Sequence, residues 1–311
     1  METKVLGPGR DTEQVEAAKA LLTELGYRIS RLFEPRPFYS DGTPPPKVMK
    51  AAILDTETTG TNPQRDKIIE LGIVVVEYDP ETGQAYRVLE TFNELEDPGC
   101  PIPPESTKIH NITDEMVAGK HIDDAAVATL MDGVSLVVAH NAAFDRAFME
   151  RRFPHFERKP WGCSFAQVPW NEEGVGSAKL EFIAYRCGFH YSGHRASVDC
   201  HALLEVLQWD LPTSGVKVLK RLLENARLPD IKVWALGSPF ESKDLLRERG
   251  YRWAAERKLW FKAISATALD EEAAWLKATV YGDRSFQLEL EKVTAINRFS
   301  ERRGAVEVVK Y

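Results

Sequence analysis

The chain has 311 residues and a formal net charge of −7. Hydrophobic residues make up 43% and charged residues 28%, the composition of a soluble globular protein with room for one substantial domain and a smaller one. No apolar run approaches the roughly 20 residues that cross a bilayer, and METKVLGPGRDTEQVEAAK has charges where a signal peptide needs an apolar core. Four dispersed cysteines without a CxxC pair argue against a zinc site and a disulfide framework, so we expect a cytoplasmic protein without membrane contact.

The first 47 residues predict an N-terminal helical extension followed by a linker. Residues 12–24 place apolar side chains at helical spacing, and Gly26 ends the helix, as a glycine beyond the last turn often does. The stretch 34–47, EPRPFYSDGTPPPK, is rich in proline and predicts a semi-rigid linker. We therefore place a domain boundary near Val48.

Residues 48–211 predict one domain. The runs 51–57 and 68–78 predict two strands, and 87–95 predicts a third that pairs with the second across a turn at 79–84. The other expected elements are a helix at 123–132, a strand at 135–140 and helices at 142–152, 178–187 and 197–209. Three antiparallel strands followed by alternating helices and strands predict an α/β fold, a mixed sheet flanked by helices.

The tail, residues 212–311, predicts a small C-terminal α+β accessory module. Its expected elements are a helix at 216–226, a strand at 231–236, a helix at 240–249, a hairpin at 251–264, a helix at 270–281 and a strand at 286–294. From Leu211 on, 19 Lys and Arg stand against 14 Asp and Glu, so positive charge gathers here although the whole chain is acidic. A basic surface can hold phosphates, but such counts also describe an ordinary solvated surface.

Two carboxylates leave the strand at 51–57 on one face. Asp55 and Glu57 are two residues apart, and side chains alternate faces along a strand, so both point the same way. Paired carboxylates after an apolar run repel each other and are costly to desolvate unless a divalent cation lies between them. The alternative is that both simply leave the strand for solvent.

Two further segments carry acidic residues. Asp145 falls in the first turn of the helix that follows the strand 135–140, beyond the carboxyl end of a strand, where α/β proteins form sites. Stabilisation of that helix by its dipole is the alternative. His194 lies in a loop, and Asp199 follows inside a helix; by itself this is an ordinary surface pair.

Together these segments resemble the DEDDh, or DnaQ-like, 3′→5′ exonuclease family, which includes exonuclease X and the proofreading (epsilon) subunits of bacterial DNA polymerase III. The resemblance covers about residues 50–210 and implies a ribonuclease H-like fold. The matching stretches are Asp55-Thr56-Glu57 for the DxE motif, His140 through Asp145 for HNxxFD, and His194, Ala196 and Asp199 for HxAxxD, with IIELG (68–72) and ITDEMV (112–117) as accessory stretches.

The resemblance implies a phosphodiesterase with two metal ions in each active site. Hard, oxygen-only ligands point to Mg²⁺ or Mn²⁺ rather than zinc. By this likeness Asp55 bridges both metals, Glu57 and Asp199 hold the water-bearing metal, and Asp145 holds the second. His194 then takes the proton from the water, a role that suits histidine.

The resemblance also implies substrate contacts. Thr56 and Thr58 flank Glu57 and are expected to touch the terminal nucleotide. Asn141 is expected to fix the turn of its motif, with substrate contact as the alternative. Three more side chains are expected to be structural or peripheral: Phe144, His110 and His140.

The terminal module mixes aromatic and basic side chains, above all in its hairpin. Such a mixture suits single-stranded nucleic acid, on whose bases aromatic rings stack, but a small module also needs large rings for its core. We expect the tryptophans mostly in the core. The candidate nucleic-acid contacts are Arg247, Arg249, Arg252 and Lys258. The segment LLRERGYRWAAERKLWFKAI (245–264) is similar to the C-terminal domain of exonuclease X-like proteins.

We therefore predict a 3′→5′ exonuclease that releases 5′-mononucleotides from DNA, preferentially single-stranded, in DNA repair or replication proofreading. Two alternatives remain. One is an RNA exonuclease, because the same catalytic residues serve either sugar, and the other is a non-catalytic nucleic-acid-binding subunit that retains the fold. A DNA polymerase is a further candidate partner, although no obvious clamp-binding peptide is present.

Overall fold

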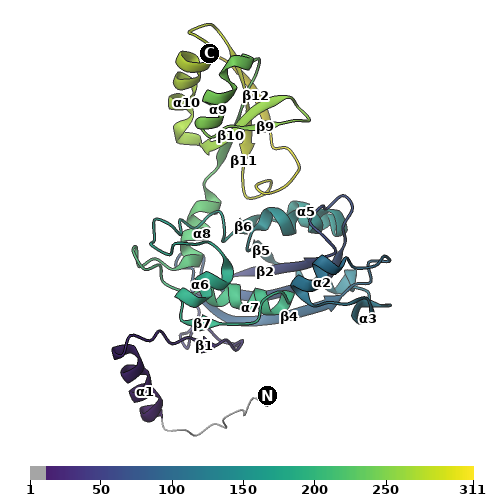
Figure 1. Cartoon of the computed structure of the whole chain (residues 1–311), viewed down its shortest axis with the longest axis vertical. Helices are drawn as coiled ribbons and strands as arrows, with labels where there is room; N and C mark the ends of the chain where they lie inside the picture. The colour runs from purple at the N-terminus through teal and green to yellow at the C-terminus, as the bar shows by residue number, and fades with distance from the viewer. Residues whose placement is uncertain (1–11) are drawn as a thin grey trace.

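The structure, a computed structural model, describes residues 12–311, which form two five-stranded sheets and one two-stranded sheet (Figure 1). Residues 1–11, METKVLGPGRD, lie outside the described residues. They include part of the predicted N-terminal extension and part of the stretch on which the expectation about a signal peptide rests. Each described helix is too short or too polar to span a bilayer. All four cysteines carry free thiols.

The first large sheet is mixed, as the sequence predicts. β2 (Met49–Thr58), β3 (Ile68–Tyr78) and β4 (Ala85–Leu95) are antiparallel neighbours. β5 (Val134–Ala139) pairs in parallel with β2, and β6 (Trp161–Cys163), a strand that the sequence analysis missed, pairs in parallel with β5. The order β4-β3-β2-β5-β6 puts β2 at the centre, so its carboxyl end lies between two neighbouring strands.

Helices cover both faces of this sheet because its central strands are apolar on both sides. Ile53 and Val74 are buried in one cluster with α6, α7 and α8, whereas Leu54 and Ile73 are buried in a second cluster with α4 and α5. The helices of this part of the chain are α2 (Pro104–His110), α3 (Asp114–Val117), α4 (Asp124–Leu130), α5 (Ala142–Arg152), η1 (Pro154–Arg158), α6 (Leu180–Arg186), α7 (Ala196–Leu207) and α8 (Val218–Arg227). The sequence analysis missed α2, α3 and η1.

α8 packs in this first core, although the sequence analysis assigns it to the terminal module. Leu219 and Leu222 are fully buried in the cluster that contains Ile53. Gly162 in β6 admits the helix, because a Cβ there would meet the Cδ2 of Leu222 at 2.6 Å. The apolar face of α8 is therefore part of the first core, and the second large sheet begins only at Asp230.

α1 (Thr12–Glu24) forms where the sequence predicts it and is followed by Gly26, whose φ of 84° is the left-handed conformation typical of a helix end. The apolar residues of the helix are not buried: Leu21 is 57% exposed and Val15 is 43% exposed. The prediction of a helix is confirmed, but among the described residues, 12–311, its apolar side chains find no core to pack into.

The segment 31–39, which runs into the predicted proline-rich linker at 34–47, packs onto the first domain. β1 (Arg31–Leu32) pairs in parallel with β7 (Phe189–His190), two short strands that the sequence analysis missed. Phe33 and Tyr39 are buried in the cluster of α7 and α8. The boundary near Val48 stays a prediction.

The second large sheet is antiparallel throughout, with the order β12-β11-β8-β10-β9. Its strands are β8 (Asp230–Ala235), β9 (Arg252–Ala254), β10 (Leu259–Ser265), β11 (Gln287–Val293) and β12 (Val306–Lys310). The predicted hairpin is β9 and β10, and β12 was missed.

Helices cover one face of this second sheet. They are η2 (Phe240–Ser242), α9 (Lys243–Glu248), η3 (Ala266–Ala268), α10 (Leu269–Trp275) and a π turn, η4 (Leu276–Val280). Leu246 and Leu276 pack on Val233, Trp260 and Ile264 of the sheet. Residues opposite one another in the register share a face, so Phe261, Trp234 and Arg252 lie on the face away from these helices.

The loop 294–303 joins the second sheet to the first domain. Arg146 of α5 is fully buried, and its guanidinium donates hydrogen bonds to the backbone carbonyls of Ala295 (3.2 Å), Arg298 (2.8 Å) and Ile296. The amide of Trp161 in β6 also donates to the carbonyl of Ala295, at 2.8 Å. The two sheets are therefore linked through the same helix that carries Asp145.

Candidate active site

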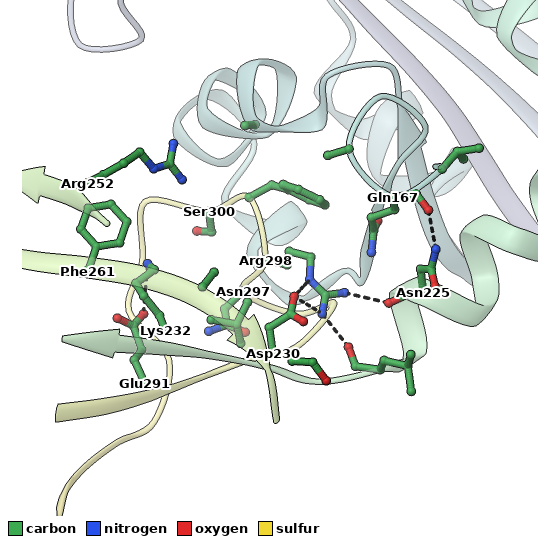
Figure 2. Close-up of a pocket in the computed structure, with 18 of the residues that line it drawn as sticks. Gln167, Asn225, Asp230, Lys232, Arg252, Phe261, Glu291, Asn297, Arg298 and Ser300 are labelled. Atoms are coloured by element: carbon green, nitrogen blue, oxygen red, sulfur yellow. Dashed lines mark hydrogen bonds and ion pairs between the residues drawn. The ribbon is translucent and has the colours of Figure 1, made fainter. Parts of the chain in front are cut away.

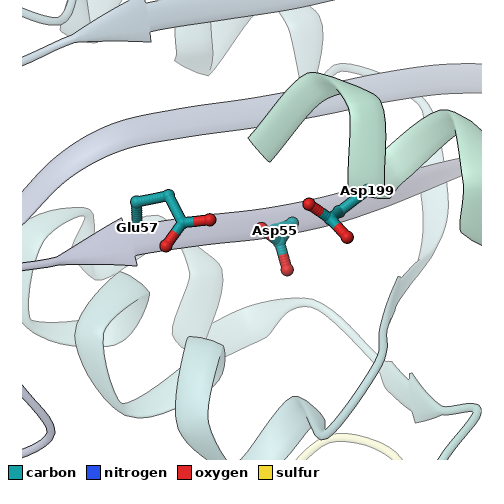
Figure 3. Close-up of side chains that lie close together, drawn as sticks. All are labelled: Asp55, Glu57 and Asp199. Carbon is teal, nitrogen blue, oxygen red and sulfur yellow. The ribbon is translucent and has the colours of Figure 1, made fainter. Parts of the chain in front are cut away.

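The acidic residues of three distant segments meet beyond the carboxyl end of β2. Asp55 and Glu57 project from β2 on one face, as the alternation predicts, and Asp199 approaches from α7 (Figure 3). One carboxylate oxygen from each of the three lies within 4.8 Å of the others. Together with Asp145 and His194 they line a cavity of about 360 Å³.

Asp145 lies in the first turn of α5, and only 2% of it is exposed. Its Oδ1 accepts hydrogen bonds from the backbone amide of Thr56 (3.1 Å) and from the Thr56 hydroxyl (2.9 Å). Burial raises the pKa of Asp145 to about 7, although the hydrogen bonds from Thr56 oppose the shift. Thr56 therefore orients Asp145 and leaves one of its oxygens available to the cavity.

The carboxylates destabilise one another in the ionised state. Burial raises the pKa of Asp55 well above its usual value, and the charges of Asp145, Asp199 and Glu57 add to the shift. Burial, followed by the charge of Asp199, raises the pKa of Glu57 to about 8. A divalent cation would remove this repulsion and keep the groups ionised, because it adds positive charge where the carboxylates converge. Clustered, oxygen-only donors fit Mg²⁺ or Mn²⁺.

Asp199 is oriented by two donors. The Tyr191 hydroxyl donates to its Oδ1 at 3.0 Å, and the backbone amide of Arg195 donates to its Oδ2 at 3.1 Å. Burial raises the pKa of Asp199, and these hydrogen bonds oppose the shift. Tyr191 is a site residue that sequence reasoning missed; its position eight residues before Asp199 gave no separate signal.

Glu70 and Gly72 place the start of α7 against the sheet. Glu70 is fully buried and accepts hydrogen bonds from the Arg195 guanidinium (2.8 Å) and from the backbone amide of Ala196 (3.1 Å). A Cβ at Gly72 would lie 2.5 Å from the carbonyl carbon of Ala196. The accessory stretch IIELG, noted in the sequence for its likeness alone, thus fixes the helix that carries Asp199.

His194 lies in the loop just before α7, as predicted. Its backbone is in the left-handed region, with φ at 65°, and half of its side chain is exposed. Its Nε2 is 3.8 Å from a carboxylate oxygen of Glu181, which lines the same cavity. The imidazole is accessible to a substrate and is held only loosely.

The other predicted site residues divide between the cavity and the interior. Asn141 lines the cavity and immediately precedes α5 with a left-handed φ of 71°, but its side chain makes no capping hydrogen bond, so its role in fixing the turn stays a prediction. Thr58 is buried, does not line the cavity and donates its hydroxyl to the carbonyl of Gly60 at 2.6 Å. Its contact with the terminal nucleotide stays a prediction.

Two residues expected to be structural line the cavity as well. His140 lines it while its Nδ1 bonds the hydroxyl of Ser164 at 2.8 Å, and burial lowers the pKa of His140 to about 4, so it is neutral at pH 7. Phe144 is half-buried against Phe148, with ring centroids 5.0 Å apart, and also lines the cavity. Sequence reasoning also missed Phe165, which lines the cavity and is 46% exposed.

The four basic residues predicted in the terminal module have different surroundings. Arg249 is bound to the buried carboxylate of Glu272 at 3.1 Å, so its charge is engaged within the module. Arg247 pairs with Asp244 at 2.8 Å and lines a cavity with Lys258. Arg252 is exposed and lines a different cavity, described below. As expected, Trp234 and Trp260 are largely buried, but Trp253 is 50% exposed.

Comparison with known proteins identifies related chains. The profile of the Exonuclease family matches residues 52–207. The chain is 29% identical over 186 residues to a DNA polymerase III PolC-type protein of Clostridium perfringens, covering 58% of this chain and 12% of that protein. It is 29% identical over 162 residues to a DNA polymerase III subunit epsilon of Treponema pallidum, covering 49% of this chain and 72% of that one. It is also similar to a solved structure of exonuclease X in complex with 5′ overhanging duplex DNA, with a TM-score of 0.39 and 24% identity over 54% of this chain and 99% of that chain.

Proposed function

The chain belongs to the Exonuclease family, a family of nucleases, and we propose that it removes nucleotides one at a time from the 3′ end of single-stranded DNA, releasing 5′-mononucleotides. One observation carries this proposal. Carboxylates from β2, α5 and α7 line a single cavity together with an accessible histidine, in the order and spacing of the family's motifs. The relatives named as DNA polymerase III proteins support DNA as the substrate.

The residues present fit divalent cations, with Asp55, Glu57 and Asp199 as ligands and Asp145 reached through its free oxygen. When bound, such cations activate water and offset the charge that develops on the phosphate. The oxygen-only donor set favours Mg²⁺ or Mn²⁺, and the family resemblance implies two ions in each site. Thr56 and Tyr191 keep two of the carboxylates in fixed orientations, which limits the reorganisation that binding requires.

His194 takes the proton from the attacking water. It is the exposed imidazole on the cavity, and its loop leaves it free to turn toward a substrate, whereas His140 is held by Ser164. Asn141 and the backbone around Thr56 contribute contacts to the terminal nucleotide. The Nε2 of His194 lies 3.8 Å from a carboxylate oxygen of Glu181, which lines the same cavity.

The relatives also suggest a place in DNA replication or repair, with a DNA polymerase as partner. The alignment covers only 12% of the PolC-type relative, so this association is a proposal. A pull-down of the full chain with a replicative DNA polymerase and its sliding clamp tests it. If the chain retains neither the polymerase nor the clamp, the proposed partnership is wrong and the chain acts as a free-standing exonuclease.

The decisive experiment compares 5′-labelled single-stranded DNA, duplex DNA and RNA, each with Mg²⁺, Mn²⁺ or EDTA. Shortening from the 3′ end of single-stranded DNA that EDTA abolishes is the expected result. Faster digestion of RNA than of DNA would mean that RNA is the substrate, and the proposed mechanism would still hold. Digestion that survives chelation, or binding without any digestion, contradicts the proposed mechanism.

A further inference from the structure

A second and larger cavity, of about 850 Å³, lies between the second large sheet and the loops and helices of the first domain (Figure 2). Its walls come from the face of the second sheet that is not covered by helices, from the loop 294–303, and from residues 166–169 of the first domain. The cavity is an unassigned concave surface between the catalytic domain and the terminal module. Sites of this kind favour the junctions between domains.

This junction cavity adjoins the acidic cavity. Ala143 lines the junction cavity, whereas its neighbour Phe144 lines the acidic one. Ala166 and Phe165 are divided between the two cavities in the same way. Residues adjacent in the chain thus line the two cavities at two places, in α5 and at residues 165–166, so the cavities are neighbours.

The sheet contributes an aromatic ring between two cations. Phe261 is half-buried, and its ring centroid is 5.6 Å from the Nζ of Lys232 and 5.5 Å from the guanidinium carbon of Arg252. All three side chains project into the cavity from neighbouring strands (Figure 2). The small side chains of Ala263 and Ser265 follow Phe261 on the same face, which leaves room above the sheet. Rings beside cations are what unpaired bases and their phosphates bind.

Four carboxylates also line the cavity: Glu172 and Glu301 are exposed, whereas Glu291 and Asp230 are engaged with other side chains. Glu291 accepts a hydrogen bond from the indole of Trp234 at 3.0 Å and lies 3.7 Å from Lys232. Asp230 pairs with Arg298 at 2.9 Å. These contacts reduce the repulsion that the carboxylates would exert on a phosphate. Arg252 is exposed and forms no ion pair within residues 12–311.

The two cavities are held in a fixed relation. The fully buried Arg146 of α5 binds three carbonyls of the loop 294–303, and the same helix supplies Ala143 and Asp145 to the two cavities. A buried guanidinium with three backbone acceptors allows little movement, because breaking any of these hydrogen bonds leaves a buried polar group unpaired. The junction is therefore preorganised for a ligand that spans both cavities.

We propose that the junction cavity binds the unpaired strand on the 5′ side of the nucleotide being removed, with a base stacked on Phe261 and phosphates beside Lys232 and Arg252. This inference rests on the proposed function, since it assigns the strand's 3′ end to the acidic cavity. It gives the terminal module a role: the module holds the strand while successive nucleotides are removed. It also accounts for a preference for single strands, because a paired base cannot stack on a protein ring.

Binding is tested by fluorescence anisotropy with 5′-fluorescein-labelled (dT)10 in EDTA, so that no metal is needed and nothing is digested. Phe261→Leu retains the packing of an apolar side chain but removes the aromatic ring, and we expect it to weaken binding about five- to 150-fold. Phe261→Trp restores binding. Arg252→Ala lowers the slope of log Kd against log salt by about 0.7 for each phosphate that the variant no longer neutralises. The matched control is Phe240→Leu, which alters a ring that is 74% exposed and lines another cavity.

Hydrolysis separates this proposal from the function on which it rests. Digestion of a dinucleotide needs only the acidic cavity, so Phe261→Leu should leave its rate within twofold while KM for (dT)10 rises at least fivefold. Equal losses on both substrates, or unchanged binding of (dT)10, would overturn the junction site. A wild-type chain that digests neither substrate but binds (dT)10 through Phe261 contradicts the proposed function and leaves the binding site standing.

Discussion

Gly72→Ala is the most direct test of how the fold positions the acidic cluster. The Cβ of an alanine at this position would lie 2.5 Å from the carbonyl carbon of Ala196 and 2.6 Å from the amide nitrogen of Ser197. Ordinary contacts begin at 3.4 Å, and neither β3 nor the backbone of α7 has a flexible end that can move aside. The helix must therefore retreat from the sheet by roughly 1 Å, and Asp199 moves with it.

A displacement of that size has two measurable consequences. Overpacking in a close-packed interior costs about 1–3 kcal/mol, which for a domain of this size lowers the midpoint of thermal unfolding by roughly 2–12 °C. Misplacing a catalytic group by roughly 1 Å costs about 100-fold in rate. We expect Gly72→Ala to fold, to have a lower melting temperature, and to digest single-stranded DNA about 100-fold more slowly. The small fraction of unfolded chain cannot account for a loss of activity of this size.

The assay pairs thermal melting by circular dichroism with initial rates of 3′-end digestion at saturating Mg²⁺. Gly42→Ala is the matched control, because its nearest atom is the side-chain Oγ of Ser40 at 3.3 Å, which can rotate away. A Gly72→Ala variant with a wild-type melting midpoint and a rate within threefold of wild type would refute the claim that the approach of α7 to β3 sets the site.

Three further outcomes follow from the same geometry. Asp199→Asn should lower the digestion rate by several orders of magnitude and His194→Ala by less, because the carboxylates remain; equal losses would contradict the roles proposed. Arg146→Ala should lower the free energy of unfolding by about 3–5 kcal/mol in urea melts, since it removes one of the ion-pair partners of Glu150 and the donor to three backbone carbonyls of the loop 294–303. Burial alone would raise the pKa of Glu150, but hydrogen bonds, led by the one from Arg302, outweigh burial and bring the pKa below its usual value of 4.5. The ionised carboxylate therefore stabilises the fold above pH 4.5, and this stabilisation is lost as the pH falls through the lowered pKa. The melting difference between wild type and Glu150→Gln should therefore shrink in acid, and a constant difference would exclude this ionisation.

The parts of the fold that depend on local pattern were predictable. The long β-branched run gave β3 with its observed bounds, Ile68–Tyr78, because no helix tolerates such a run well. The alternation along β2 placed Asp55 and Glu57 on one face, where their oxygens meet Asp199. β6 and β12 were missed because strands of three and five residues are too short to show a clear alternation of apolar and polar residues in the sequence.

The parts that depend on distant partners were not predictable. The likeness of IIELG to a family stretch gave no role for Glu70, whose partner Arg195 is 125 residues away and binds it only after the sheet and α7 have formed. The motif marks the position of Thr58 and not the direction of its side chain, whose hydroxyl binds the carbonyl of Gly60; its contact with the nucleotide stays a prediction. The helix α8 was assigned to the terminal module by its place in the chain, whereas its apolar residues pack in the first core.

Arg146 is the clearest case of a long-range determinant. In the sequence it is one of several arginines on α5. A glutamate four residues later, Glu150, is a spacing that is common on exposed helices and so does not indicate burial. In the structure it is fully buried, and its other partners are backbone carbonyls about 150 residues away, which no side-chain pattern records. A guanidinium suits this position because its planar fork can satisfy several carbonyls at once, whereas lysine offers a single point charge. Arg146→Lys should therefore behave like Arg146→Ala in loosening the junction, and its effect on long substrates should exceed its effect on dinucleotides.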